Sequence, residues 1–263
     1  MKFLAALLAI VSFAASAADA DGPTLQRIRQ SGELRVGTET GYMPFEMRSK
    51  SGEIVGFDMD IARLMARQLG VKLTLVNISW DGIVPALLTG KFDLLMAGMT
   101  ITEERARRVD FADPYIEIGQ SALIPRSQAG RVKSIKDLDA PSFKIVTKLG
   151  TTGEIAARKF LPHANLRTFE TEAEAAMEVR NGRADALIYD SPFNMIFAAR
   201  HKDSLVNLQP PFTREPLGWA VRKKDPAFVA WLNRFLARIK ADGSYEALHR
   251  KWFESDAWLA DVN

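Results

Sequence analysis

The apolar positions in the first part of the chain follow two different periods. Residues 34–38 and 71–76 carry the alternation of half-buried strands, and 92–97 is a short apolar run. Between them, the apolar residues of 61–69 and 80–88 recur at helical spacing, and each of these segments is followed by a glycine. Strands that alternate with helices in this way predict an α/β unit whose sheet is largely parallel and covered by helices.

A second series of elements repeats this order. Strands are predicted at 143–147, 166–169 and 186–189, with helices at 154–160 and 172–181 between them. Two phrases also echo each other, GKFDLL from Gly90 and GRADAL from Gly182, each a helix stop followed by a strand. The pattern therefore predicts two lobes of similar plan, each a mostly parallel sheet flanked by helices.

Two proline-containing segments are candidates for the chain crossing from one lobe to the other. They are 114–119 and 210–213, and we expect hinges at about 115–119 and 212–216. If the chain crosses twice, its C-terminal part, with a helix at 226–242, returns to the first lobe. The expected domains are then 24–116 plus 214–263 for lobe 1 and 117–213 for lobe 2.

The first 18 residues have the pattern of a secretory signal peptide. Lys2 precedes an apolar run over 3–13, and the small residues of 15–18 offer a cleavage site. The run is too short for a bilayer, which needs about 20 apolar residues. With no cysteine in the chain, a lipid-modified N-terminal cysteine is excluded. These features predict a soluble, monomeric periplasmic protein without stable membrane insertion.

Composition excludes several classes of function. Lys and Arg number 35 against 32 Asp and Glu, an excess too small for a nucleic-acid footprint. The three histidines, His163, His201 and His249, lack metal-ligand spacing. Because cysteine is absent, thiol catalysis is impossible. We therefore expect no metal, no cofactor and no nucleic-acid partner.

The segment 97–105, AGMTITEER, combines small residues, hydroxyls and an arginine that suit a carboxylate ligand. Backbone N–H groups near Gly98 and Thr100 can donate hydrogen bonds, and Arg105 offers a planar bidentate fork. The alternative is an ordinary connection from strand to helix with Thr102 as N-cap. The other small or polar strand-end segments, 150–152 and 189–190, fall at the carboxyl ends of predicted strands as well, where open α/β sheets bind ligands.

In this order, six segments resemble the polar amino-acid binding proteins of ABC importers, solute-binding proteins with the type II periplasmic fold. The segments are GYMPFE (41–46), VGFDMDIA (55–62), WDGIVPAL (80–87), 97–105, VDFADPY (109–115) and DGSY (242–245). The resemblance covers essentially the whole mature chain. It implies two lobes that close on a free L-amino acid with a polar or cationic side chain and deliver it to a cognate inner-membrane ABC permease.

The resemblance also implies roles for individual residues. Arg105 would bind the ligand's α-carboxylate, with the Gly98 and Thr100 main chain and the Thr100 hydroxyl beside it. From the other lobe, Thr152 would donate at a helix start, where the dipole favours an anion. Asp190 would take the α-ammonium, although an Asp before Ser-Pro can equally be a helix N-cap.

The residues that would contact the ligand's side chain give conflicting indications of its chemistry. Tyr42 and Trp80 resemble an aromatic pair around it, with core packing as the alternative. Glu39 would favour a polar or cationic side chain, unless it is an exposed acid, whereas Lys148 would repel a cation. The complete predicted ligand-binding set is Glu39, Tyr42, Trp80, Gly98, Met99, Thr100, Arg105, Lys148, Thr152, Tyr189 and Asp190.

Two other functions remain alternatives. Cyclohexadienyl dehydratases, which act on prephenate or arogenate, share this fold, and in them a glutamate three positions after the strand-end aspartate is the general acid. Here that position is Phe193, so we expect no enzyme and no catalytic residue. A sensory ligand-binding module would be fused to membrane and signalling segments, which this chain lacks.

Overall fold

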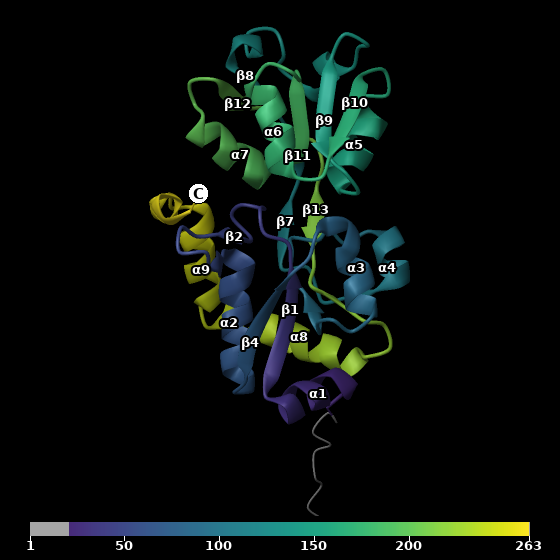
Figure 1. The fold of residues 1–263 in the computed structure, drawn as a ribbon, viewed down its shortest axis with the longest axis vertical. Coiled ribbons are helices and arrows are strands. Elements are labelled where there is room, and N and C mark those ends of the chain that lie inside the picture. The colour runs from purple at the N-terminus through teal and green to yellow at the C-terminus, as the bar shows by residue number, and fades with distance from the viewer. Residues whose placement is uncertain (1–20, 263) are drawn as a thin grey trace, which may run out of the picture.

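The computed structural model describes residues 21–262 and divides them between two α/β lobes joined by two strands (Figure 1). The predicted two-lobed α/β fold with two crossings is confirmed. The signal peptide predicted at 1–18 lies outside the described residues. Among the described helices, none is long and apolar enough to cross a membrane.

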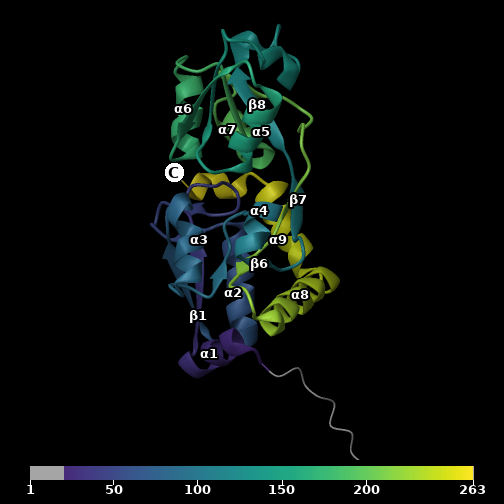
Figure 2. The same cartoon turned by 90° about the vertical axis from the view of Figure 1, so that its right-hand side faces the viewer.

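The first lobe contains both N-terminal and C-terminal elements (Figures 1 and 2). They are α1 (Pro23–Ser31), β1 (Glu33–Thr38), β2 (Met47–Arg48), β3 (Ile54–Val55), α2 (Phe57–Leu69), β4 (Lys72–Asn77), α3 (Trp80–Leu88), β5 (Leu94–Leu95), α4 (Glu103–Arg108), β6 (Asp110–Phe111), β14 (Ala220–Val221), α8 (Pro226–Ala241), α9 (Ser244–Phe253) and the 3₁₀ helix η3 (Ala257–Asp261).

The second lobe is built from the middle of the chain. Its elements are β8 (Gln120–Pro125), η1 (Arg126–Gln128), η2 (Ile135–Leu138), β9 (Lys144–Lys148), α5 (Thr152–Phe160), β10 (Asn165–Phe169), α6 (Glu172–Arg180), β11 (Ala186–Asp190), α7 (Ser191–Arg200) and β12 (Leu205–Asn207). Strands β7 (Ile116–Ile118) and β13 (Glu215–Leu217) pair antiparallel between the lobes, with Glu215 opposite Ile118.

Each lobe has one five-stranded sheet, and the two sheets have the same plan. Their orders are β4-β1-β5-β14-β6 and β10-β9-β11-β8-β12. In each, the first three strands are parallel and the last two join antiparallel. The sheets are therefore mixed rather than mostly parallel. The strands that make them so, β14 and β8, are those that follow a crossing and enter their sheet from the hinge side.

The local predictions hold for the strongly periodic segments and fail elsewhere. The strand expected at 92–97 shortens to β5, and helices α1 and α9 have no counterpart among the predicted elements. Helix α7 begins directly after β11 with no polar turn between them, and its apolar residues do not keep to one face: Phe193 and Phe197 are buried, whereas Met195 is exposed. The apolar pattern therefore gives no helix signal there, and only Asp190 before Ser-Pro indicates a helix start.

The two similar sequences, GKFDLL from Gly90 and GRADAL from Gly182, form the same hydrogen-bonding arrangement in both lobes. The Asp93 amide donates to Arg35 O, and Asp93 Oδ2 accepts from Arg35 N, each at 2.9 Å. In the second lobe Asp185 makes the equivalent pair of bonds with Lys144 N and O, each at 2.8 Å. Each aspartate thus ties the start of one strand to its parallel neighbour.

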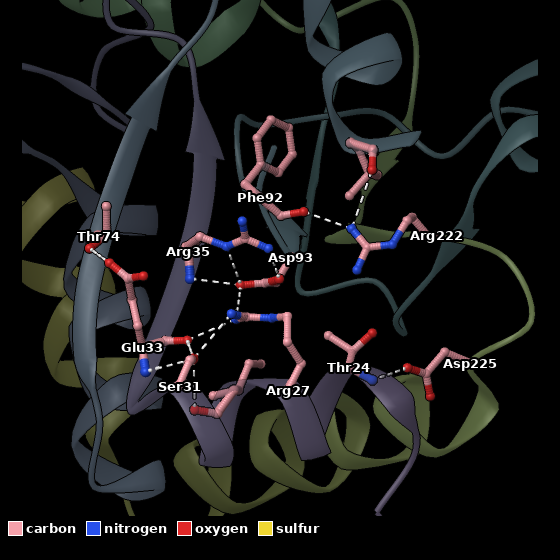
Figure 3. Close-up of polar contacts among 12 residues, drawn as sticks. Thr24, Arg27, Ser31, Glu33, Arg35, Thr74, Phe92, Asp93, Arg222 and Asp225 are labelled. Carbon is pink, nitrogen blue, oxygen red and sulfur yellow. Dashed lines mark hydrogen bonds and ion pairs between the residues drawn. The ribbon is translucent and has the colours of Figure 1, made fainter. Parts of the chain in front are cut away.

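Asp93 also has charged partners beside α1, the helix at the end of the first lobe away from the second lobe (Figures 1 and 3). Its side chain is fully buried, and it forms ion pairs with Arg35 NH2 at 2.8 Å and with Arg27 NH2. The Asp93 cluster, defined as these three residues, connects α1 and β1 to β5. Strand β5 in turn leads into the segment 97–105 at its other end.

Candidate ligand-binding cleft

A cavity between the lobes collects nearly all of the predicted site residues. The space between its lining atoms, including the open mouth, is about 310 Å³. Its lining consists of Glu39, Tyr42, Trp80, Ala97, Gly98, Thr100, Arg105, Lys148, Thr151, Thr152, Tyr189 and Asp190. Ten of the eleven predicted residues are in this set, and Ala97 and Thr151 are additions.

Met99 is the predicted residue that does not line the cavity. Its side chain is 2 % exposed and belongs to a hydrophobic cluster with Ile83, Leu95 and Val109, because the chain alternates faces as it leaves β5. Only its carbonyl takes part in a described hydrogen bond, accepting from Gly218 N at 3.0 Å. Met99 is therefore a core residue that supports the loop from behind.

The Gly98 amide was expected to face the ligand, and the structure corrects this. It donates instead to Oδ2 of the fully buried Asp58 at 3.2 Å, and the Tyr115 hydroxyl donates to the same oxygen at 3.0 Å. Gly98 has φ +54°, and a Cβ there would meet the Tyr42 ring at 2.3 Å. Glycine is thus required for a different reason, which is the close packing of Tyr42 on the loop.

Arg105 reaches the cavity from the first turn of α4. Thr102 caps this helix, and its side chain accepts from Arg105 N at 3.2 Å. Capping by Thr102 is therefore compatible with Arg105 lining the cavity. The guanidinium donates to Thr100 O at 2.9 Å and, from NH2, to Gly150 O at 3.4 Å. Within residues 21–262 no carboxylate forms an ion pair with Arg105. Burial lowers its pKa, against the attraction of Asp190 and Glu215.

Asp190 lies in the other lobe as the last residue of β11. It occupies the N-cap position of α7, but its side chain does not cap the helix. It accepts instead from the Tyr42 hydroxyl and from Gln120 Nε2, the latter at 2.5 Å. Burial, and then the charge of Glu215, raise the pKa of Asp190 to about 7. Among the described residues no Lys or Arg forms an ion pair with it.

Direct contacts join the two lobes through the cavity. Trp80 Nε1 donates to Gly150 O at 3.0 Å, the Thr100 and Thr152 hydroxyls are 3.2 Å apart, and the Tyr42 hydroxyl binds Asp190. An ion pair between Lys148 and Glu39 adds a fourth contact, with Nζ 2.5 Å from Oε2. The structure is therefore closed around the cavity.

Three polar residues around the cavity were not predicted from the sequence: Gln120, Glu172 and Glu215. Glu215 Oε2 accepts from the Thr100 hydroxyl at 3.1 Å and from Gln120 Nε2 at 3.2 Å, which links the crossing strand to both lobes. Glu172 pairs with Lys148. The available signal was weak: Glu215 and Gln120 are isolated polar residues beside the predicted hinges, and Glu172 is an ordinary first residue of a helix.

Phe193, the residue at the position of the dehydratase acid, lies apart from the cavity lining. It is fully buried, with its ring centroid 5.5 Å from that of Tyr189 and 5.6 Å from that of Phe197. An aromatic ring in this cluster has no proton to donate.

Comparison with known proteins agrees with this geometry. Residues 34–255 match the model of the bacterial extracellular solute-binding proteins, family 3. A binding component of an ABC transporter from Wolinella succinogenes, solved in complex with lysine, is similar to the chain, with 53% identity and a TM-score of 0.85 over 88% of this chain and 99% of that one.

Two curated relatives represent the two functional alternatives. The ABC transporter glutamine-binding protein GlnH of Bacillus subtilis is 34% identical over 89% of this chain and 85% of its own. The cyclohexadienyl dehydratase of Pseudomonas aeruginosa is 28% identical over 95% and 93%, respectively. With its family model matched over most of its length, the chain belongs to the family 3 bacterial extracellular solute-binding proteins.

Proposed function

We propose that this protein binds a free L-amino acid in the cleft, with Arg105 on the α-carboxylate and Asp190 on the α-ammonium. One observation carries the proposal. Within residues 21–262, an arginine that forms no ion pair with a carboxylate and an aspartate that forms none with a cation, from opposite lobes, line the same closed cavity. A zwitterion supplies the missing partner of each, and charge-assisted bonds of this kind are among the stronger ones in proteins.

Closure follows from the same arrangement. Because Arg105 and Asp190 belong to different lobes, both can hold one zwitterion only when the cleft is shut, so the ligand favours the closed state by its differential affinity. We place the hinges at 115–119 and 212–216, where β7 and β13 pair. The proposed lobes are 24–116 with 214–263, and 117–213.

The remaining lining residues would receive the side chain of the ligand. Trp80 and Tyr42 supply aromatic surface, Glu39 and Lys148 supply charge, and Thr100, Thr152 and Tyr189 complete the wall. This lining favours a polar or cationic side chain over an apolar one. The lysine bound to the Wolinella relative is consistent with that preference. The protein would act in the periplasm and deliver its ligand to an inner-membrane ABC permease.

A thermal-shift screen against the common amino acids tests this proposal. A ligand that binds only the folded protein raises the apparent stability by mass action, by about 2.7 kcal/mol at a hundredfold excess over Kd. We expect one or a few polar or cationic L-amino acids to raise Tm by several degrees, and their D-enantiomers to have much smaller effects. If none of the common L-amino acids changes Tm, the proposal is wrong.

The similarity to a dehydratase makes catalysis the second candidate. Incubation with prephenate and arogenate, followed by detection of phenylpyruvate or phenylalanine, decides the question. We expect no turnover above the uncatalysed rate, because Phe193 replaces the acid and lies outside the cavity lining. Turnover that disappears in Arg105→Ala would show that the cleft is an active site.

A further inference from the structure

Lys148 is held between two carboxylates rather than left free in the cleft. Its Nζ lies 2.5 Å from Glu39 Oε2 and 2.8 Å from Glu172 Oε2. Glu39 comes from the first lobe, whereas Lys148 and Glu172 come from β9 and α6 of the second. We name these three residues the cleft triad. Glu172 does not line the cavity, and its hydrogen bond to Lys148 connects it to the lining.

All three members of the cleft triad are withdrawn from solvent. Their side chains are 14 %, 2 % and 1 % exposed for Glu39, Lys148 and Glu172. Burial disfavours the ammonium, but the attraction of the two carboxylates is larger and raises the pKa of Lys148. Glu172 is the first residue of α6, where the helix dipole favours a negative charge. The triad therefore sets two carboxyl groups against one ammonium, and burial raises the pKa of Glu39 against the attraction of Lys148.

Other ionisable groups lie near the cleft triad. Glu46 is fully buried, and burial raises its pKa well above the usual range, which favours its neutral form. Arg105 and Asp190 are matched by the two charges of the ligand's α-groups under the proposed function. Glu215 bonds to Thr100, Gln120 and Thr213 beside them. Within the cleft triad itself, two carboxylates face one ammonium where the ligand's side chain would lie.

We propose that Glu172 is a specificity-determining residue that makes the cleft selective for amino acids with a singly positive side chain. Without it, Glu39 and Lys148 would cancel, and a cationic side chain would bring an unmatched charge into a closed site. With it, the side chain of lysine or arginine brings the sum to zero. With both glutamates present, Lys148 reduces the charge of the triad to minus one and does not repel the ligand. This resolves the conflict between Glu39, which was expected to favour a cationic side chain, and Lys148, which was expected to repel one.

This inference rests on the proposed function, and charge-neutralising variants test it. The quantity to measure is the ratio of Kd for L-glutamine to Kd for L-lysine, by isothermal titration calorimetry at pH 7. We expect Glu172→Gln to lower this ratio at least about tenfold, because like charges in a site of low dielectric repel strongly. Lys148→Met should raise it, and the double variant should return towards the wild type.

Glu174→Gln is the matched control. It removes the same charge from the same helix, and its amide oxygen can still accept the bond from Thr171 N. A thermal melt of each variant checks that it is folded. If Glu172→Gln weakens both ligands equally, or resembles Glu174→Gln, or if the wild type prefers glutamine, the inference is wrong while amino-acid binding stands. If the wild type binds no amino acid, both proposals are wrong.

Discussion

The Asp93 cluster and the cleft triad are mirror images in charge and differ in what they connect. One buried acid lies between two arginines within the first lobe, and one buried lysine lies between two acids across the cleft. Under the proposed lobe closure, the first would keep its partners whether the cleft is open or shut, because all three residues belong to one lobe. In the second, the bond between Lys148 and Glu39 would form only on closure, because the two residues come from different lobes. We therefore expect similar chemistry to serve stability in one place and ligand selection in the other.

The largest expected effect is a loss of unfolding free energy with little change in ligand binding. Asp93→Ala leaves Arg27 and Arg35 without their carboxylate, and breaking a buried pair typically costs about 3 kcal/mol or more. We expect chemical denaturation to show a loss of that order, with ligand Kd changed less than about threefold, since sites without shared partners are nearly additive.

The control for Asp93 is an exposed ion pair in the same lobe. Asp110 pairs with Lys223 at 3.2 Å, and their side chains are 38 % and 41 % exposed, respectively. Asp110→Ala should cost less than about 1 kcal/mol. Equal losses in the two variants would show that burial does not distinguish the Asp93 cluster from an ordinary surface pair.

In the cleft we expect the opposite result, which is weaker ligand binding with little change in the unfolding free energy. Arg105→Ala removes the proposed carboxylate ligand, and we expect binding to weaken by at least about 2 kcal/mol, or roughly thirtyfold. The unfolding free energy of the ligand-free protein should change little, because Arg105 forms no ion pair within residues 21–262. Calorimetric titration measures the first quantity, and denaturation measures the second.

Arg107→Ala is the control for this prediction, since that arginine lies on the same helix with a side chain 77 % exposed. Wild-type affinity in Arg105→Ala, or an equal loss in Arg107→Ala, would remove Arg105 from the site.

A smaller effect is expected from pH. Burial raises the pKa values of Asp58 and Asp190 to about 7, from an ordinary 3.8. The folded state therefore binds more protons than the unfolded state between about pH 4 and 7, and these groups make stability fall as pH rises through that window. We expect the ligand-free protein to lose stability from pH 5 to 8, and Asp190→Asn to lose less. An unchanged slope in Asp190→Asn would contradict the assignment.

Some residues of the cleft could be predicted from the sequence and others could not, and the reason is physical. Trp80, Arg105 and Asp190 were accessible from the sequence because they follow strands or begin helices with recognisable glycine, hydroxyl or proline neighbours. Glu172 and Glu215 were not, because nothing local distinguishes them from solvated acids, and only the meeting of distant strands buries them. The orientations of Gly98 and Met99 depended on Asp58 and the core behind them, which no local pattern encodes.

Under the proposed function, the two lobes clasp the α-carboxylate and the α-ammonium of one amino acid. Calorimetric titration with L-lysine, 6-aminohexanoate, which lacks the α-ammonium, and 1,5-diaminopentane, which lacks the α-carboxylate, tests it directly. We predict one saturable site for lysine, and binding at least about tenfold weaker for each analogue, because a buried charge loses its partner. Binding of either analogue as tightly as lysine would contradict the account.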